Sequence, residues 1–144
     1  MPKAQTILDR KGTDVATIDR KASVLDAAAA MNDRRIGALV VIDGDRVVGI
    51  FTERDILCRV VAERKIPGDT LVGDTMTTPM VCCQRQTPLA ECRAIMTTKR
   101  IRHLPIVEDG KLYGLISSGD ILAHEVADQQ TEIEYLHDYL YGRS

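Results

Sequence analysis

The spacing of hydrophobic and polar residues divides most of the chain into two similar halves. Each half contains a segment whose apolar residues recur at helical intervals, followed by two runs of aliphatic residues separated by a short polar stretch with a glycine. These segments lie at 23–31, 36–42 and 47–51 in the first half and at 87–96, 101–107 and 112–116 in the second. The pattern predicts a helix followed by a β-hairpin in each half, because β-branched residues favour strands and glycine favours the turn.

A short strand is expected before each of these helices, near 15–18 and 80–83, and a second helix after each hairpin, so that each half has the order β-α-β-β-α. Ser23 is expected to cap the helix of the first half. Thr87 is expected to cap the equivalent helix of the second half, with Pro88 at its first helical position.

The two halves are copies of one unit. A shift of 65 residues aligns them without a gap from Thr17 to Leu57, and the shift also places Ile7 on Val72 and Lys11 on Met76. Identical pairs include Ala29/Ala94, Met31/Met96, Arg35/Arg100, Ile36/Ile101, Leu39/Leu104, Gly49/Gly114, Asp55/Asp120, Ile56/Ile121 and Leu57/Leu122. One unit of about 50 residues is too small to bury its sheet alone. We therefore expect two tandem repeats of an α+β (α/β) fold, packed about a pseudo-two-fold axis around a common core.

This interpretation divides the 144 residues into five parts. They are an N-terminal segment that joins the module, the first repeat, a linker that leads into the second repeat, the second repeat and a helical tail. Their expected ranges are 1–14, 15–62, 63–79, 80–127 and 128–144.

Composition narrows the classes of function. The chain is 44% hydrophobic and 28% charged, with a net charge of −2, four Tyr, one Phe and no Trp, which argues against nucleic-acid binding by charge or by base stacking. The apolar run at 36–42 is far too short to span a membrane, and the first residues lack the apolar stretch of a signal peptide. We expect a cytoplasmic protein.

Catalytic chemistry has little support in the sequence. The four cysteines form no C-x-x-C pair and the three histidines are scattered, so no zinc site or other metal site is expected. Neither a phosphate-binding GxxxxGK[ST] loop nor an evident pair of nucleophile and base is present. We expect small buried thiols, no required cofactor and no enzymatic activity, with a redox role of Cys82–Cys83 and weak nucleotide hydrolysis as the alternatives.

One heptad occurs in both repeats, as GIFTERD at 49–55 and GLISSGD at 114–120. Thr52 with Asp55, and Ser117 with Asp120, match the S/T-x-x-D/E pattern of a helix capping box. A second interpretation uses the same geometry for binding. A carboxylate beside a cleft can accept two hydrogen bonds from vicinal ribose hydroxyls, and a helix N-terminus offers donors to an anion. The residues alone do not choose between capping and binding.

The segments GIFTERDIL, GLISSGDIL, IGALVVID and IRHLPIVEDGKLYG resemble a tandem pair of cystathionine-β-synthase (CBS) domains, also called a Bateman module. The resemblance covers residues 5–125, and the closing residues from Val126 resemble the tail of short stand-alone bacterial proteins of this type. It implies a regulatory module that binds AMP, ADP, ATP, NAD(H) or S-adenosylmethionine between the repeats. The alternative is a scaffold with empty clefts that serves protein interaction.

The resemblance also implies roles for individual residues. Asp55 and Asp120, with Thr52 and Ser117, would hold the ribose. The wall of the purine pocket would be formed by small or apolar residues, namely Ala22, Ala27, Ile36 and Gly37 near Asp55, and Thr87, Cys92 and Ile101, together with Arg102, near Asp120. Cys92 could instead be a small filler of the core.

The same resemblance predicts that the two clefts differ. The second strand of one repeat would begin opposite the heptad of the other, which places Arg102 and His103 against Asp55 as phosphate ligands. Asp120 would then face Gly37 and Ala38, which carry no charge, with Arg54 as the nearest cation. The alternatives are a solvated Arg102 and a structurally packed His103.

The last part of the chain predicts self-association. Leu122, Val126, Ile133, Leu136 and Leu140 form an imperfect helical stripe that is interrupted near DQQTE. No further repeat follows that this stripe could cover, so we expect it to pack across a homodimer. Folding back onto its own module is the alternative. An effector protein remains a possible further partner, which the sequence does not identify.

Overall fold

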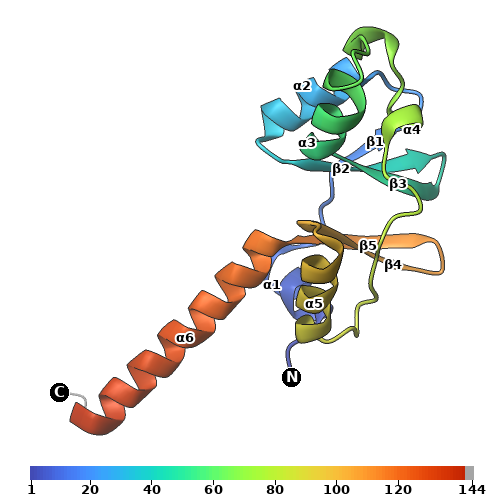
Figure 1. The fold of residues 1–144 in the computed structure, drawn as a ribbon. Helices are drawn as coiled ribbons and strands as arrows, with labels where there is room; N and C mark the ends of the chain where they lie inside the picture. The colour runs from blue at the N-terminus through green and yellow to red at the C-terminus, as the bar shows by residue number, and fades with distance from the viewer. Residues whose placement is uncertain (142–144) are drawn as a thin grey trace.

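The computed structural model describes residues 1–141 as two stacked halves from which one long helix projects (Figure 1). The upper half contains a sheet of three strands, β1 (Thr17–Asp19), β2 (Ala38–Asp43) and β3 (Arg46–Thr52). Strand β1 runs parallel to β2, and β2 pairs with β3 as an antiparallel hairpin. Its helical segments are α2 (Val24–Arg34), α3 (Glu53–Asp55), which continues as a π-helical segment over Ile56–Val61, a 3-10 turn at Pro67–Asp69, and α4 (Val72–Thr75).

The lower half repeats this arrangement with α1 (Ala4–Lys11), α5 (Leu89–Lys99), the antiparallel hairpin β4 (His103–Glu108) and β5 (Lys111–Ser117), and α6 (Ser118–Tyr141). The strand expected near 80–83 is reduced to one parallel bridge between Cys83 and Ile106. The equivalent strand of the first repeat receives a hydrogen bond from the Val40 amide to the Ala16 carbonyl oxygen, 3.1 Å away. Pro105 occupies the position of Val40 and has no amide proton to donate, so the ladder cannot extend.

The predicted helix starts are largely confirmed. The Ser23 hydroxyl caps α2 by accepting from the Asp26 amide at 3.0 Å. In α5, however, Pro88 is itself the capping residue, and the Thr87 hydroxyl accepts from the Gln84 amide outside the helix. The cap at Thr87 was therefore predicted one residue too early, because the preceding loop uses its hydroxyl for a local turn.

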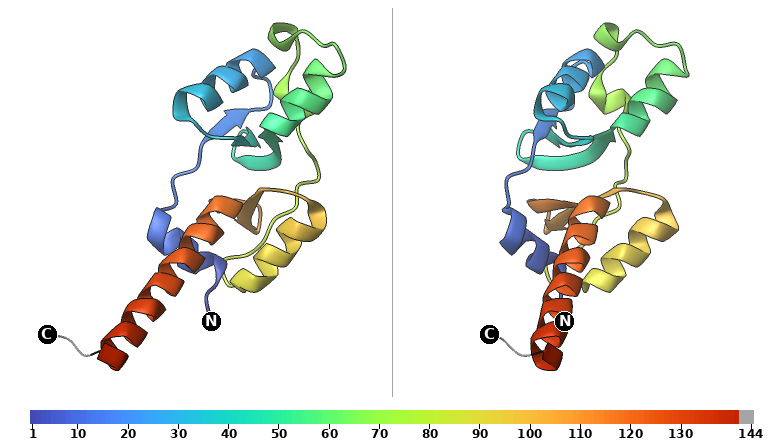
Figure 2. Two further views of the ribbon diagram at one scale, coloured as in Figure 1. Left: turned by 60° about the vertical axis from the view of Figure 1, so that its left-hand side comes forward. Right: turned by 90° about the vertical axis from the view of Figure 1, so that its left-hand side faces the viewer.

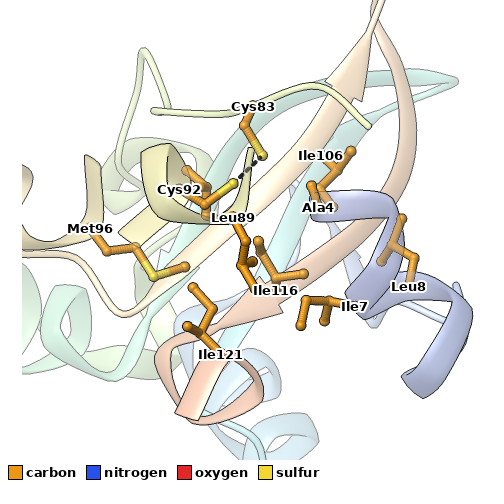
Figure 3. Packing of buried hydrophobic residues seen from close by; sticks show 11 residues of the cluster. Ala4, Ile7, Leu8, Cys83, Leu89, Cys92, Met96, Ile106, Ile116 and Ile121 are labelled. Atoms are coloured by element: carbon orange, nitrogen blue, oxygen red, sulfur yellow. Dashed lines mark hydrogen bonds between the residues drawn. The ribbon is translucent and has the colours of Figure 1, made fainter. Parts of the chain in front are cut away.

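The buried apolar residues form two core clusters rather than the common core expected from the sequence. The cluster of the first repeat includes Phe51, Val72 and Met76, whereas that of the second includes Ile7 and Leu8 (Figure 3). The segment that precedes each repeat thus packs on the opposite repeat. Each small sheet gains a cover from this exchange, so two separate cores become possible.

The glycine of each heptad is explained by this packing. A Cβ atom on Gly49 would lie 2.7 Å from Sδ of Met76 and 2.8 Å from the carbonyl oxygen of Thr77, and a Cβ atom on Gly114 would overlap the Leu8 side chain. Glycine lets the segment before each repeat approach the last strand of the opposite repeat. This use of glycine depends on close approach and not on an unusual backbone angle.

The tail is one continuous helix within the described residues, and the predicted break of its apolar stripe near DQQTE does not interrupt the helix. The first turns of α6 pack beside α5 and β5, where Ile121 is buried. Further along, α6 leaves the two halves and extends away from them in all three views (Figures 1 and 2).

Candidate functional site

Two cavities lie between the repeats, and each contains one heptad aspartate. The cavity with Asp55, here called the Asp55 cleft, has a volume of about 620 Å³. The cavity with Asp120, here called the Asp120 cleft, has a volume of about 480 Å³. Volumes of this size fit a small organic ligand. Several residues that line one cleft are equivalent, under the 65-residue shift, to residues that line the other. Ala16 in the Asp120 cleft and Val81 in the Asp55 cleft are one such pair.

Asp55 is held at the start of α3 by a complete capping box. Its Oδ2 accepts hydrogen bonds from the Thr52 amide at 2.9 Å and the Thr52 hydroxyl at 3.3 Å, and the Asp55 amide donates to that hydroxyl at 3.3 Å. Oδ1 accepts from the Thr77 hydroxyl at 2.9 Å and lies 3.6 Å from Nε of Arg59. Asp55 is 5% exposed, so its position is fixed before any ligand binds.

Asp120 has the same capping contacts but a different third partner. Its Oδ2 accepts from the Ser117 amide at 2.8 Å, and its own amide donates to the Ser117 hydroxyl at 3.1 Å. Nζ of Lys11 donates to Oδ2 at 2.7 Å and to the Leu115 carbonyl oxygen at 2.9 Å. Burial alone would raise the pKa of Asp120, but Lys11 and the Ser117 amide together hold it below the usual value.

The lining of the Asp55 cleft agrees with the predicted pairing of the two repeats. Arg102 and His103 line this cleft from the start of β4, opposite Thr52 and Asp55, and His103 also lines the Asp120 cleft. Burial lowers the pKa of His103 despite the opposing influence of Glu53, so its imidazole is neutral at pH 7. His103 is therefore suited to donating or accepting a hydrogen bond and not to supplying positive charge.

The predicted charge difference between the clefts is wrong. Lys11, Arg34 and Arg35 line the Asp120 cleft, although Gly37 and Ala38 lie there as expected. Arg54 lines the Asp55 cleft instead, because it precedes Asp55 on the same short helix. Both clefts therefore contain cations.

Several residues assigned to the purine wall lie elsewhere. Ile36 lines the Asp120 cleft and Ile101 lines the Asp55 cleft, which reverses the prediction, whereas Gly37 lines both. Arg102, assigned to the Asp120 side as well, lines the Asp55 cleft. The two isoleucines are reversed because each precedes the second strand of its repeat, and this strand begins opposite the heptad of the other repeat. Four residues are used in folding, since Ala27 and Cys92 are fully buried in the cores, Ala22 packs against a core and Thr87 supports a turn.

The sequence interpretation missed an arginine at the mouth of each cleft. Arg35 and Arg100 end α2 and α5 in the left-handed conformation, with φ of 53° and 55°, and line the Asp120 and Asp55 clefts respectively. Glycine is the usual residue at such a helix end. The 65-residue shift pairs them as identical residues, but the sequence interpretation assigned neither arginine to a cleft. Lys11 was also missed, because its aligned partner, Met76, carries no charge.

Cys92 and Cys83 belong to the second core and not to a site, with their sulfur atoms 3.8 Å apart (Figure 3). The sulfur contact and burial raise the pKa of the Cys83 thiol. No cluster of possible metal ligands occurs in the described part of the chain, and no helix there is long and apolar enough to cross a bilayer.

The paired repeats with a capped aspartate at each inter-repeat cleft define a tandem pair of one α+β unit. The family model for the CBS domain matches residues 10–62 and 72–127, and the chain belongs to the CBS-domain family.

Among curated relatives, the chain is 32% identical to the mitochondrial CBS domain-containing protein CBSX3 of Arabidopsis thaliana, over 83% of this chain and 61% of that protein. It is 29% identical to the CBS domain-containing protein YhcV of Bacillus subtilis, over 86% and 88%. The chain thus spans less than two thirds of the plant protein and most of the bacterial one.

Solved structures show the same fold. A protein from Burkholderia ambifaria, described as a candidate signal-transduction protein with CBS domains, matches with a TM-score of 0.84 and 38% identity, over 89% of this chain and 96% of that one. A hexameric CBS-CP12 protein from bloom-forming cyanobacteria matches with a TM-score of 0.74 and 30% identity, over 85% and 70%. These proteins carry the names of signal-transduction or CBS-domain proteins and not of enzymes.

Proposed function

We propose that the chain is a sensor that binds adenine-containing nucleotides in its two clefts and signals through a change in the arrangement of its repeats or of a homodimer. One observation carries this proposal. In each cleft, a fixed carboxylate from one repeat lies opposite cationic residues contributed from outside that repeat. This pairing suits a ligand with a diol at one end and an anionic group at the other.

In the Asp55 cleft, Asp55 and Thr52 would hold the ribose. The carboxylate is already oriented, and its two oxygens together have about four acceptor positions. Three of these accept from Thr52 and Thr77, so one ribose hydroxyl can bind directly and the second would replace one of the threonine hydroxyls. Arg102 and Arg54 would hold the phosphates, because guanidinium groups donate paired hydrogen bonds to phosphate oxygens. Ile101 and Val81 offer apolar surface to the base.

In the Asp120 cleft, Asp120 and Ser117 would hold the ribose, and Arg34 and Arg35 would hold the phosphates. Both the Ser117 amide and Lys11 donate to Oδ2 of Asp120, so Oδ1 can accept from a ribose hydroxyl. Lys11 would then turn toward a phosphate or remain on Oδ2. Binding shifts a conformational equilibrium only by the difference in affinity between the two arrangements.

The capping boxes favour a second candidate, a scaffold with empty clefts. Each heptad aspartate already completes a helix start, and Asp120 also has a cationic partner. A purely structural role therefore accounts for both aspartates. The scaffold would act through protein contacts with an effector, and nucleotides would not change its stability.

A melting screen distinguishes these candidates. AMP, ADP, ATP, NAD, NADH and S-adenosylmethionine would be tested at millimolar concentration. A ligand at one hundred times its dissociation constant stabilises the folded state by about 2.7 kcal/mol, or about 5–10 °C for a chain of this size. If none of these ligands raises the melting temperature, the result contradicts the sensor and favours the scaffold.

Calorimetry then assigns the clefts. We expect Asp55→Asn and Asp120→Asn each to remove one binding event and the double variant to remove both. Asp45→Asn is the matched control, because Asp45 is exposed in the β2–β3 turn, away from both clefts. Two unchanged binding events in the double variant would show that the nucleotide binds elsewhere.

A further inference from the structure

The projecting helix α6 has a regular heptad pattern of apolar residues, where the sequence alone predicted only an imperfect apolar stripe. Val126, Ile133 and Leu140 follow one another at intervals of seven. Leu122, Gln129 and Leu136 form a second series at intervals of seven. Gln129 lies three residues after Val126, and Leu136 lies three residues after Ile133. Because the helix is continuous over 118–141, these residues occupy alternating a and d positions along one face. The apparent interruption near DQQTE is a single polar residue at one d position.

This face, here called the α6 seam and made of Leu122, Val126, Gln129, Ile133, Leu136 and Leu140, is uncovered. The exposed fraction is 60% for Leu122 and remains at 50% or more for the other four aliphatic residues. The module packs against a different side of the helix, where Ile121 is buried and Glu125 pairs with Arg93. From Leu122 to Leu140 the seam is about 27 Å long, and Figure 2 shows the distal part of α6 extending away from both repeats.

The charge of α6 narrows what can cover the seam. Residues 118–141 contain six acidic residues and neither Lys nor Arg. Helices that lie on membranes instead carry basic residues on their polar face, so an anionic bilayer would repel this one. A strict a/d repeat of period 3.5 is the pattern by which helices pair with each other. The seam is also self-complementary, since equal positions in two copies have equal sizes.

The flanking positions favour one relative orientation. The g positions nearest the seam are Glu125 and Glu132, and the facing e positions are Gln130 and His137. In a parallel pair, Glu132 of one copy faces His137 of the other and Glu125 faces Gln130, so no acidic side chain meets another. In the antiparallel pair that aligns the seam residues, Glu132 would face its own equivalent. Like charges at that position disfavour the antiparallel arrangement.

We propose that the α6 seam joins two copies of this chain as a parallel, in-register, two-stranded coiled coil. Val126, Ile133 and Leu140 would form a layers, and Leu122 and Leu136 would form d layers. Gln129 would form one polar layer whose amides can hydrogen-bond across the pair, which favours this register over a shifted one. No residue of the α6 seam lines either cleft, so its test does not depend on the proposed function.

The orientation is tested on the full chain by cross-linking. In a background with Cys58→Ser and Cys82→Ser, which removes the exposed thiols, Leu140→Cys is treated with a short bis-maleimide. A parallel pair places the two introduced thiols in one layer and gives a covalent dimer. An antiparallel pair separates them by about 27 Å and gives none. Tyr135→Cys is the matched control, because position 135 lies off the seam, and it is expected to cross-link far less.

The contribution of the seam is tested by sedimentation. Ile133→Glu places two carboxylates in one apolar layer and is expected to raise the dimer dissociation constant by about 100-fold or more. Thr131→Glu adds the same charge on the outer face and is expected to change it by less than about threefold. An unchanged dimer in Ile133→Glu, a monomeric wild-type chain, or a Leu140→Cys variant that does not cross-link would each overturn the proposal.

Discussion

The contact between Lys11 and Asp120 leads to the sharpest prediction. Lys11→Met replaces the lysine by the residue that stands at the equivalent position of the other repeat, Met76. The substitution removes a charge-assisted hydrogen bond of 2.7 Å to Asp120 and a second bond of 2.9 Å to the Leu115 carbonyl oxygen. The aliphatic stem of the side chain is largely retained, so the loss is mainly electrostatic.

The magnitude follows from the burial of the pair. A hydrogen bond to a charged group contributes about 1.5–3 kcal/mol, whereas an exposed ion pair contributes about 0–1 kcal/mol. The side chains of Lys11 and Asp120 are 35% and 25% exposed, which places this pair between these limits. We expect Lys11→Met to lower the free energy of unfolding by about 1–2 kcal/mol at pH 7. For a chain of this length, the melting temperature would fall by about 2–8 °C.

The pH dependence tests the cause. The pKa of Asp120 is lowered in the folded state, so its interaction stabilises the protein above the unfolded pKa of about 3.9 and is lost as the pH falls through the folded pKa. The difference between Lys11→Met and the wild type should therefore be constant from about pH 5 to 8 and shrink below about pH 4. Thermal unfolding monitored by circular dichroism measures it across this range.

The matched control is Lys65→Met, because Lys65 lies exposed in the loop after the first repeat. It reports the effect of exchanging lysine for methionine without the partly buried carboxylate, and we expect a change of less than about 0.5 kcal/mol. A Lys11→Met variant as stable as the wild type at pH 7, or one whose deficit persists unchanged at pH 3, would show that the contact does not stabilise the fold.

Two further predictions concern the heptads and are checked by denaturant unfolding. Gly49→Ala should lower the free energy of unfolding by about 1–3 kcal/mol, because the new methyl group meets the rigid carbonyl oxygen of Thr77. Gly114→Ala should lower it by less, because the flexible Leu8 side chain can move. Equal losses in the two variants would contradict this reasoning. Thr77→Val should destabilise by about 1–3 kcal/mol by removing a hydrogen bond to the buried Asp55 carboxylate, so an unchanged midpoint would show that Asp55 is satisfied without it.

Local features were predictable from the sequence. The two hairpins, the cap at Ser23 and both heptad capping boxes depend on residues a few positions apart, and the structure confirms them. The short strand expected near 80–83 is reduced to one bridge, because its neighbour in the sheet contains Pro105. Pro105 has no amide proton to donate to that strand, and this effect can be foreseen only once the pairing of the two strands is known.

Residues brought together across the fold were the harder part. Lys11 lies 109 positions before Asp120, and only the packing of α1 on the second repeat places them in contact. The placement of Arg54 failed for a related reason, since the direction of a side chain on a short helix determines which cleft it lines. By contrast, the assignment of Arg102 to the Asp55 cleft agrees with the structure, because the resemblance to paired CBS domains implied which strand begins opposite which heptad, whereas its second assignment, near Asp120, was wrong.

The exchanged positions of α1 and α4 affect how the protein unfolds. The segment before the first repeat completes the core of the second, and the segment before the second completes the core of the first. When one repeat unfolds, the other loses a helix that covers its core. The two cores should therefore unfold in one cooperative transition, although they are separate in space. A chain with a single repeat could form the same packing only if it exchanged its preceding helix with a second copy. The tandem chain is thus the covalently joined equivalent of a domain-swapped dimer.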